Sequence, residues 1–222
     1  METANPTITP QLLQDALLLK RDPAIAKVNA VFDGQIQELC LRTRYPKEMT
    51  AFIAACLAQR GELEKGVGER CFFVRDRESW TQLCGSSSSC ILVAQPELDF
   101  ESARNELLQQ ARVGHNAVIF ALTNPRADLA EVVDLIEPSQ HEVRELLKKH
   151  NYPPADADRL ATRSNGNIYF LTQLLSGTSE RRKWATGDDG YQIRCLALVG
   201  GWNDRSEGDQ SALSELLGQP YE

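Results

Sequence analysis

Short apolar runs alternate with helical patterns along most of the chain. Each run holds four to seven residues and is rich in valine, isoleucine, leucine, phenylalanine or cysteine, which is typical of buried strands. The five runs are residues 36–42, 71–74, 90–94, 117–122 and 131–136. Strands joined through helices cannot form hairpins, so they are expected to pair in parallel. The pattern therefore predicts an α/β fold with a doubly wound, mainly parallel five-stranded sheet.

Helical patterns fill the spaces between these runs. Pro46 can begin the first helix, Asp76 is a suitable cap for the second, and the third covers residues 100–112. One buried stripe is predicted on the first helix, formed by Phe52, Ile53, Cys56 and Leu57. The fourth and fifth runs are separated by a short connection without a helical pattern.

Residues 1–35 predict an N-terminal helical segment made of two short helices. Thr9 with Pro10, and Asp22 with Pro23, are pairs of a capping residue and a first-turn proline. Apolar residues at helical spacing follow each pair: Leu12, Leu13, Ala16 and Leu17, then Ile25, Val28, Val31 and Phe32. Both helices are therefore expected to bury one face.

Three further helices are predicted in residues 138–177. Ser139 and Glu142 have the spacing of a capping box, in which each side chain satisfies a backbone donor of the other residue. The second helix is broken at Asn165 and Gly166, and Asn167 begins the third. Apolar residues at three- and four-residue spacing give each helix a face to bury.

Composition narrows the class of protein. With 222 residues, 42% hydrophobic and 25% charged, the chain has room for one full core and a smaller second unit. No apolar stretch reaches the ~18 residues of a membrane span, and the first residues lack a basic and then apolar leader. We therefore expect a cytoplasmic protein. The net charge of −7 weighs against nucleic acid as a partner of the whole chain.

The six cysteines are interpreted as reduced, structural thiols. They lie mostly within or beside apolar runs and form no Cys-x-x-Cys pair of the kind used for zinc or redox exchange. They are Cys40, Cys56, Cys71, Cys84, Cys90 and Cys195. No metal site is predicted.

The order of elements resembles the nucleotide-binding core and lid of the AAA+ and STAND class of P-loop ATPases. The resemblance rests on five strands followed by a small helical bundle, and on the helix junction Arg163-Ser164-Asn165-Gly166-Asn167. It implies a core over residues 36–137 and a lid over 138–177. Residues 178–222 would then be a linker and the start of a winged-helix-like module, or a tail that packs on the lid. The first reading implies that the chain is a piece of a larger protein.

The phosphate loop of that class is not intact here. Its first strand runs into Gly-x-x-x-x-Gly-Lys-Ser/Thr, whose glycines let backbone donors wrap the phosphates. The corresponding stretch is residues 41–48, in which only Lys47 fits. Pro46 removes a donor, and Glu48 is expected to bring negative charge to the phosphate site. A second stretch, residues 61–68, resembles such a loop superficially but has valine in the lysine position, and we interpret it as a surface loop.

The other catalytic positions of the class are also altered. The third strand leads to Ala94-Gln95-Pro96 instead of an acidic pair, and Glu97 and Asp99 come a few residues late. Asn124, after the fourth strand, is similar to the polar sensor of the terminal phosphate, but Asn124-Pro125 is also a common turn. The lid arginine is missing from its usual place, and Arg163 lies one turn earlier.

Three functions remain open from the sequence. The first is a non-catalytic switch, scaffold or oligomerisation module of a larger prokaryotic regulatory or defence-type protein, whose partner would be another protein or a second copy. The second is a residual sensor that binds ATP or ADP through Lys47, Asn124 and Arg163. The third is an unrelated doubly wound enzyme with a pocket at the carboxyl ends of the strands. No catalytic residue is predicted, because each lost phosphate-stabilising group typically costs a factor of ~100 or more in rate.

Overall fold

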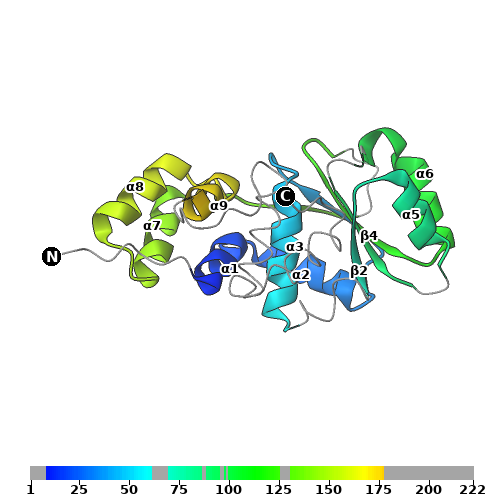
Figure 1. Cartoon of the computed structure of the whole chain (residues 1–222), viewed down its shortest axis with the longest axis horizontal. Helices are drawn as coiled ribbons and strands as arrows, with labels where there is room; N and C mark the ends of the chain where they lie inside the picture. The colour runs from blue at the N-terminus through cyan, green and yellow to red at the C-terminus, as the bar shows by residue number, and fades with distance from the viewer. Residues whose placement is uncertain are drawn as a thin grey trace.

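The computed structural model describes residues 9–61, 70–86, 89–95, 98, 100–125 and 131–177 (Figure 1). Within these residues five strands form one sheet in the order β2-β3-β4-β1-β5, and every neighbouring pair is parallel. The strands are β1 Glu38–Arg42, β2 Cys71–Val74, β3 Ile91–Ala94, β4 Ala117–Leu122 and β5 Val132–Asp134. The predicted parallel five-stranded α/β sheet is confirmed.

Helices precede, connect and follow these strands. They are α1 Pro10–Leu18, α2 Asp22–Phe32, α3 Glu48–Gln59, α5 Arg77–Cys84, α6 Phe100–Val113, α7 Gln140–Lys149, α8 Pro154–Ser164 and α9 Ile168–Gly177. The expected capping bonds of Thr9, Asp76 and Ser139 are present, and Ser139 forms the full capping box with Glu142. The prediction that Asp22 caps the second helix is wrong: Arg21 occupies the cap position and makes no capping bond.

Strand β1 begins two residues later than predicted. The backbone N–H groups of Gln35 and Ile36 both donate to Ala30 O, which closes the end of α2. Because these donors are used there, Ile36 belongs to the helix end rather than to the sheet ladder. The helix expected to begin at Pro46 also begins two residues later, at Glu48.

Two apolar cores lie on opposite faces of the sheet. Leu39 and Leu41 of β1 pack in the core formed with α1, α2 and α3, whereas Cys40 belongs to the core formed with α5 and α6. This division follows from the alternation of side chains along a strand. Figure 1 shows α2 and α3 on one side of the strands and α5 and α6 on the other. The fold is therefore doubly wound, as predicted.

Helix α3 is buried on all sides, which corrects the prediction of a single buried stripe. Every residue from Glu48 to Leu57 is buried. The helix faces the sheet and also packs against α1 and α2. A helix that is apolar all round is typically enclosed by other elements. The N-terminal segment supplies that cover, and the local pattern of α3 alone could not show it.

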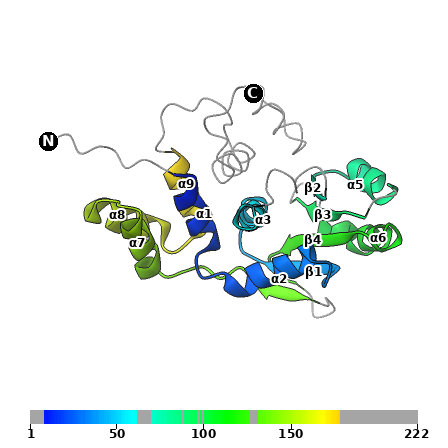
Figure 2. The same cartoon turned by 90° about the horizontal axis from the view of Figure 1, so that it is seen from below.

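The last three helices pack beside the N-terminal helix α1. Helix α7 packs on α8 and α8 on α9, and α1 contacts α7, α9 and α3. Figure 2 shows α1 between these helices and α3. Helix α8 ends at Asn165 and Gly166, both in the left-handed region with φ of 51° and 80°. The Asn167 side chain then accepts a hydrogen bond from Phe170 N at 2.8 Å and begins α9.

The five cysteines in the described part of the chain are free thiols, and four of them are buried. Burial raises the pKa of Cys40 and of Cys56 to about 12 and that of Cys90 to about 11. Such thiols are poor nucleophiles at neutral pH. The interpretation as structural thiols agrees with this burial.

Several predictions fall outside the described residues. They concern the loop at 62–69, Glu97 and Asp99, Cys195, and the linker and module at 178–222. None of the helices that the structure describes combines the length and apolar character needed to cross a membrane.

Candidate functional site

The carboxyl ends of β3, β4, β1 and β5 lie side by side along one edge of the sheet. In open parallel α/β sheets ligands bind beyond these ends, where consecutive connections leave toward opposite faces. Here the connection after β1 leads to α3 on one face and the connection after β3 leads to α6 on the other. The edge is therefore the candidate site, and two hollows that open on it are lined by residues the structure describes.

The larger hollow has a volume of about 400 Å³ and lies over the ends of β1 and β5. Arg42, Thr43 and Arg44 line it from β1 and the residues that follow. Asp134 of β5 and Glu137 of the linker, here the segment 135–139 between β5 and α7, line it from the other side. Arg42 and Asp134 form a bidentate ion pair, and the hydrogen bonds from Arg42 lower the pKa of Asp134. One of the two arginines is thus already paired, and carboxylates stand on the opposite wall.

The smaller hollow has a volume of about 170 Å³ and lies over the ends of β3 and β4. Its walls include Pro46, Gln95, Phe100, Leu122 and Thr123. This volume is below the ~300–1,000 Å³ of sites that enclose larger ligands. A nucleoside triphosphate does not fit within it.

The loop after β1 uses its backbone donors inside the protein. Tyr45 N donates to Thr43 Oγ1 at 3.1 Å, and Glu48 N donates to Tyr45 O at 2.9 Å. Pro46 has no N–H to offer. A phosphate cradle needs successive backbone N–H groups that point at the anion. In residues 43–48 much of this donor set is absent or already satisfied.

An aromatic contact joins this loop to the last helix. The rings of Tyr45 and Tyr169 are stacked, with centroids 5.5 Å apart and planes 6° from parallel. Tyr169 lies in the first turn of α9, just after the Gly166-Asn167 pair. Stacked aromatic pairs contribute about 0.5–1.5 kcal/mol beyond the area they bury. The loop and the helical bundle are thus held together by side chains of the protein itself.

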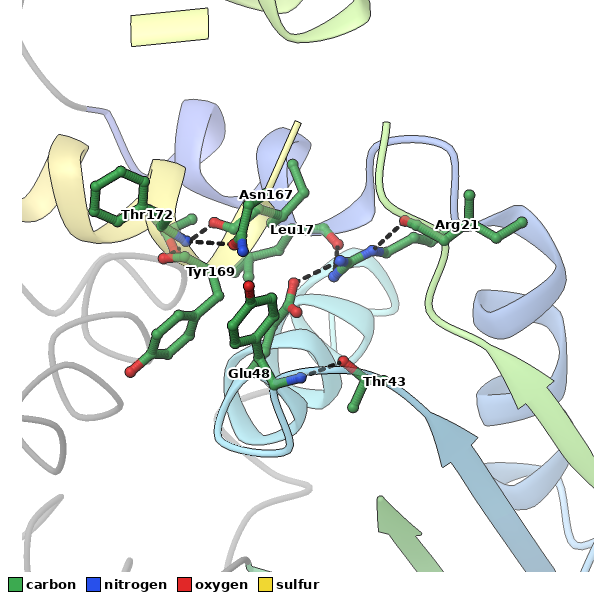
Figure 3. A network of polar contacts seen from close by, with 11 residues as sticks. Leu17, Arg21, Thr43, Glu48, Asn167, Tyr169 and Thr172 are labelled. Atoms are coloured by element: carbon green, nitrogen blue, oxygen red, sulfur yellow. Dashed lines mark hydrogen bonds and ion pairs between the residues drawn. The ribbon is translucent and has the colours of Figure 1, made fainter. Parts of the chain in front are cut away.

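A buried arginine, Arg21, joins three segments near this contact (Figure 3). Arg21 is fully buried, and it donates to Leu17 O at 3.1 Å and to Ile136 O at 3.3 Å. Its Nη2 lies 2.5 Å from Glu48 Oε1, and its guanidinium lies over the ring of Phe52 at 5.6 Å from the ring centre. Arg21 therefore connects the end of α1, the start of α3 and the linker that leads into α7.

The Arg21–Glu48 contact is a buried ion pair. Both side chains are at most 2% exposed, and the geometry is that of an ion pair rather than an aligned hydrogen bond. Burial raises the pKa of Glu48, and the positive charge of Arg21 opposes this effect. The expectation that Glu48 brings negative charge to the phosphate site is therefore corrected: the carboxylate turns inward and is neutralised by Arg21.

The three residues proposed to hold a nucleotide lie at separate places. Lys47 is half-buried at the cap position of α3, Asn124 is exposed just after β4, and Arg163 is exposed in the last turn of α8. Lys47 and Asn124 follow neighbouring strands, because Arg42 pairs with Leu122 in the sheet. None of the three is among the described residues that line either hollow.

Gln95 follows β3, at the position where the ATPases that the sequence resembles carry their acidic pair. It is 1% exposed, and neither its Nε2 nor its Oε1 has a hydrogen-bond partner. A neutral amide cannot replace two carboxylates as a magnesium site. Within the described ranges, no cluster of three or more histidine, cysteine, aspartate or glutamate side chains could hold a metal ion.

Comparisons with protein-family models, curated proteins and solved structures return no match. The function is therefore inferred from the geometry of this chain and from the resemblance seen in its sequence.

Sequence reasoning missed Arg21, Gln95 and Tyr169 as residues of this site. Arg21 directly follows the first helix, where a solvated basic residue is common, so no local signal separates it from a surface arginine. Tyr169 lies in an apolar helical pattern. The one sequence signal that could have singled it out is its place just after the helix junction at residues 163–167. The partners of both residues are far away in the sequence.

The contact between α1 and α7 contains a carboxylate, Asp15, whose contribution to stability should depend on pH. Asp15 Oδ2 lies 3.0 Å from His150 Nε2 and 3.3 Å from Lys149 Nζ. Burial acts to raise the pKa of Asp15, but the hydrogen bonds from Gln11, His150 and Lys149 outweigh it, so the pKa lies below its ordinary value. A carboxylate with a lowered pKa stabilises the fold above its unfolded pKa, and this contribution is lost as the pH falls through the folded pKa.

We therefore expect Asp15→Asn to lower the free energy of unfolding at pH 7 by about 1 kcal/mol or less, because the pair is partly exposed. Urea unfolding over a series of pH values should show the difference from the unmodified protein shrink as the pH falls through the Asp15 pKa. Asp22→Asn, at an exposed residue without a capping bond, is the control and should have a smaller effect. A difference that stays constant with pH would show that Asp15 does not act through its charge.

Proposed function

We propose that this chain is a degenerate AAA+/STAND-like domain that works without nucleotide, as a non-catalytic scaffold or oligomerisation module. Its partner would be another protein or a second copy of the chain. A role in a larger regulatory or defence-type protein is part of this proposal and comes from the resemblance alone. The single observation that carries the proposal is the closure of the loop after β1 by contacts within the protein.

The order of the strands supports the link to this class of ATPases. In a working member the phosphate loop, the acidic pair and the polar sensor follow the first, third and fourth strands, and all three must reach one terminal phosphate. The sheet has β4 directly between β1 and β3, so these three ends are neighbours. The order differs from the 3-2-1-4-5-6 and 2-1-3-4-5 orders of the two other common doubly wound folds.

The contacts at the loop support the absence of nucleotide. In an ATP-driven switch the nucleotide itself links the core to the lid, so hydrolysis can release the lid. Here Tyr45 stacks on Tyr169 of α9, and Arg21 binds both Glu48 of α3 and the backbone of Ile136 in the linker. These links need no ligand. A lid held in this way presents a constant surface, which suits a scaffold better than a switch.

Thermal unfolding with nucleotides tests the proposal. We expect no rise in the melting temperature with ATP or ADP, with or without magnesium, and no magnesium-dependent hydrolysis above background. A ligand at one hundred times its dissociation constant would stabilise the fold by about 2.7 kcal/mol, which is readily measured. Stabilisation by ATP that disappears in Lys47→Ala would instead support the residual sensor. Sedimentation velocity over a range of concentrations tests self-association separately.

A further inference from the structure

The smaller hollow contains an unusual polar group. Gln95 follows β3, lines the hollow and is 1% exposed, yet both polar atoms of its amide lack a partner. Its backbone is fully used, since Gln95 N donates to Val74 O and Gln95 O accepts from Leu98 N. A buried polar group without a partner is costly, and most buried polar groups in proteins are hydrogen-bonded. The orphaned amide therefore indicates a missing donor and a missing acceptor beside it.

We propose that this hollow binds a small uncharged molecule through a carboxamide or an equivalent edge with an adjacent donor and acceptor. Such an edge can donate to Gln95 Oε1 and accept from Gln95 Nε2 in one planar pair. Both amide atoms are buried in this structure, so binding requires the Gln95 side chain to rotate toward the hollow that it lines. The proposal does not depend on the scaffold function and holds whether or not the lid is locked.

The position of the hollow fits a ligand site. It lies over the end of β4, between the connection from β1 to α3 and the connection from β3 to α6, which leave toward opposite faces of the sheet. This is the place where doubly wound sheets bind their ligands. Pro46 belongs to the first connection, and Phe100 begins the helix of the second.

The walls determine the size and charge of the ligand. Phe100, Leu122 and Ala94 are apolar and buried, and Phe100 is held by a stacked contact with Phe120 at 4.5 Å. An apolar cavity of about 150 Å³ is large enough for benzene, so about 170 Å³ accepts one ring or a short aliphatic chain. Glu101 is the only charged residue among the described residues of the wall, which disfavours anions such as carboxylates and phosphates.

Benzamide is the probe that tests this inference, because it combines one ring with one carboxamide. Titrated into the full chain, it should shift the side-chain amide signal of Gln95 in nitrogen-correlated NMR spectra, with a dissociation constant on the order of 1 mM for so small a ligand. Benzoate has the same ring but lacks the donor and carries a negative charge. It should bind at least several-fold more weakly, since it leaves Gln95 Oε1 unpaired and is repelled by Glu101.

Two variants and a matched control make the result specific. Gln95→Met keeps the length of the side chain without its polar atoms, and it should weaken benzamide binding about tenfold or more while the melting temperature stays the same or rises. Gln82→Met, at an exposed glutamine of α5, is the matched control and should leave binding unchanged. Thr123→Val removes a hydroxyl group from another wall residue. Because Thr123 is exposed, the change carries little risk to folding, and the affinity for benzamide should fall several-fold.

The proposal is overturned if benzamide leaves the Gln95 signal unmoved, or if it binds Gln95→Met as tightly as the unmodified protein. Equal binding of benzoate would also overturn it, because the site would then recognise the ring alone. A crystal structure with a water molecule bonded to both amide atoms, which benzamide does not displace, would assign the hollow to structural water. Nucleotide titrations leave these outcomes unaffected, so failure here is separate from failure of the scaffold function.

Discussion

Replacing Glu48 with leucine should destabilise the protein by about 3–5 kcal/mol, because it leaves the Arg21 guanidinium buried without a counter-charge. Arg21 is fully buried and would keep only its bonds to the carbonyls of Leu17 and Ile136. For a protein of this size the loss corresponds to a fall of about 10 °C in melting temperature. Thermal and urea unfolding of Glu48→Leu would measure it.

A double variant separates the charge effect from the packing effect. In Arg21→Met with Glu48→Leu both charges are removed and similar volume is kept, so stability should return to near the original value or exceed it. Glu145→Leu is the matched control, since Glu145 pairs with Lys148 on the exposed face of α7 and should cost less than about 0.5 kcal/mol. If Glu48→Leu behaves like Glu145→Leu, the pair does not hold the α1, α3 and linker segments together.

The features that could be predicted from the sequence are those that depend on residues close together along the chain. The caps at Thr9, Asp76 and Ser139 and the alternation of strands and helices depend on residues a few positions apart, and each is present in the structure. Parallel pairing then follows from the length of the connections. The strand boundary at Ile36 was wrong because the end of α2 competes for the same backbone donor.

The candidate site depends instead on contacts between distant residues. The sequence shows that residues 41–48 do not fit the phosphate-loop motif, but it does not show which contacts these residues make. The sequence places the charge of Glu48 at the phosphate site, and only the structure shows that Glu48 lies against the buried Arg21. It likewise gives no sign that Tyr45 stacks on Tyr169 of α9. Gln95 could not be predicted for another reason. What distinguishes it is a buried amide without a hydrogen-bond partner, and no sequence pattern indicates an unsatisfied polar group.

The packing of α8 against the segment that leads into α7 can be tested at Gly166, where we expect alanine to cost about 3–5 kcal/mol. Gly166 has φ of +80°, and a Cβ atom there would lie 2.0 Å from the carbonyl oxygen of Pro138 in the linker. Neither atom can move freely, because Pro138 directly precedes the capping box that begins α7. The added methyl group must therefore push the end of α8 away from the start of α7. Urea unfolding of Gly166→Ala would measure the loss.

Gly34→Ala separates this clash from the strain of the backbone itself. Gly34 has a similar φ of +74°, but nothing lies within 4 Å of the position a Cβ would take. It should therefore cost only about 1–2 kcal/mol, the penalty of a left-handed conformation for an L-residue. Hydrogen exchange of backbone amides gives a second distinction. In Gly166→Ala the amides of α7, α8 and α9 should lose protection while those of β1 and β4 keep theirs. The reason is that the clash lies between the end of α8 and the segment before α7. Equal losses in the two variants would mean that the backbone at Pro138 can move aside. The contact between Gly166 and Pro138 would then not fix the position of α8.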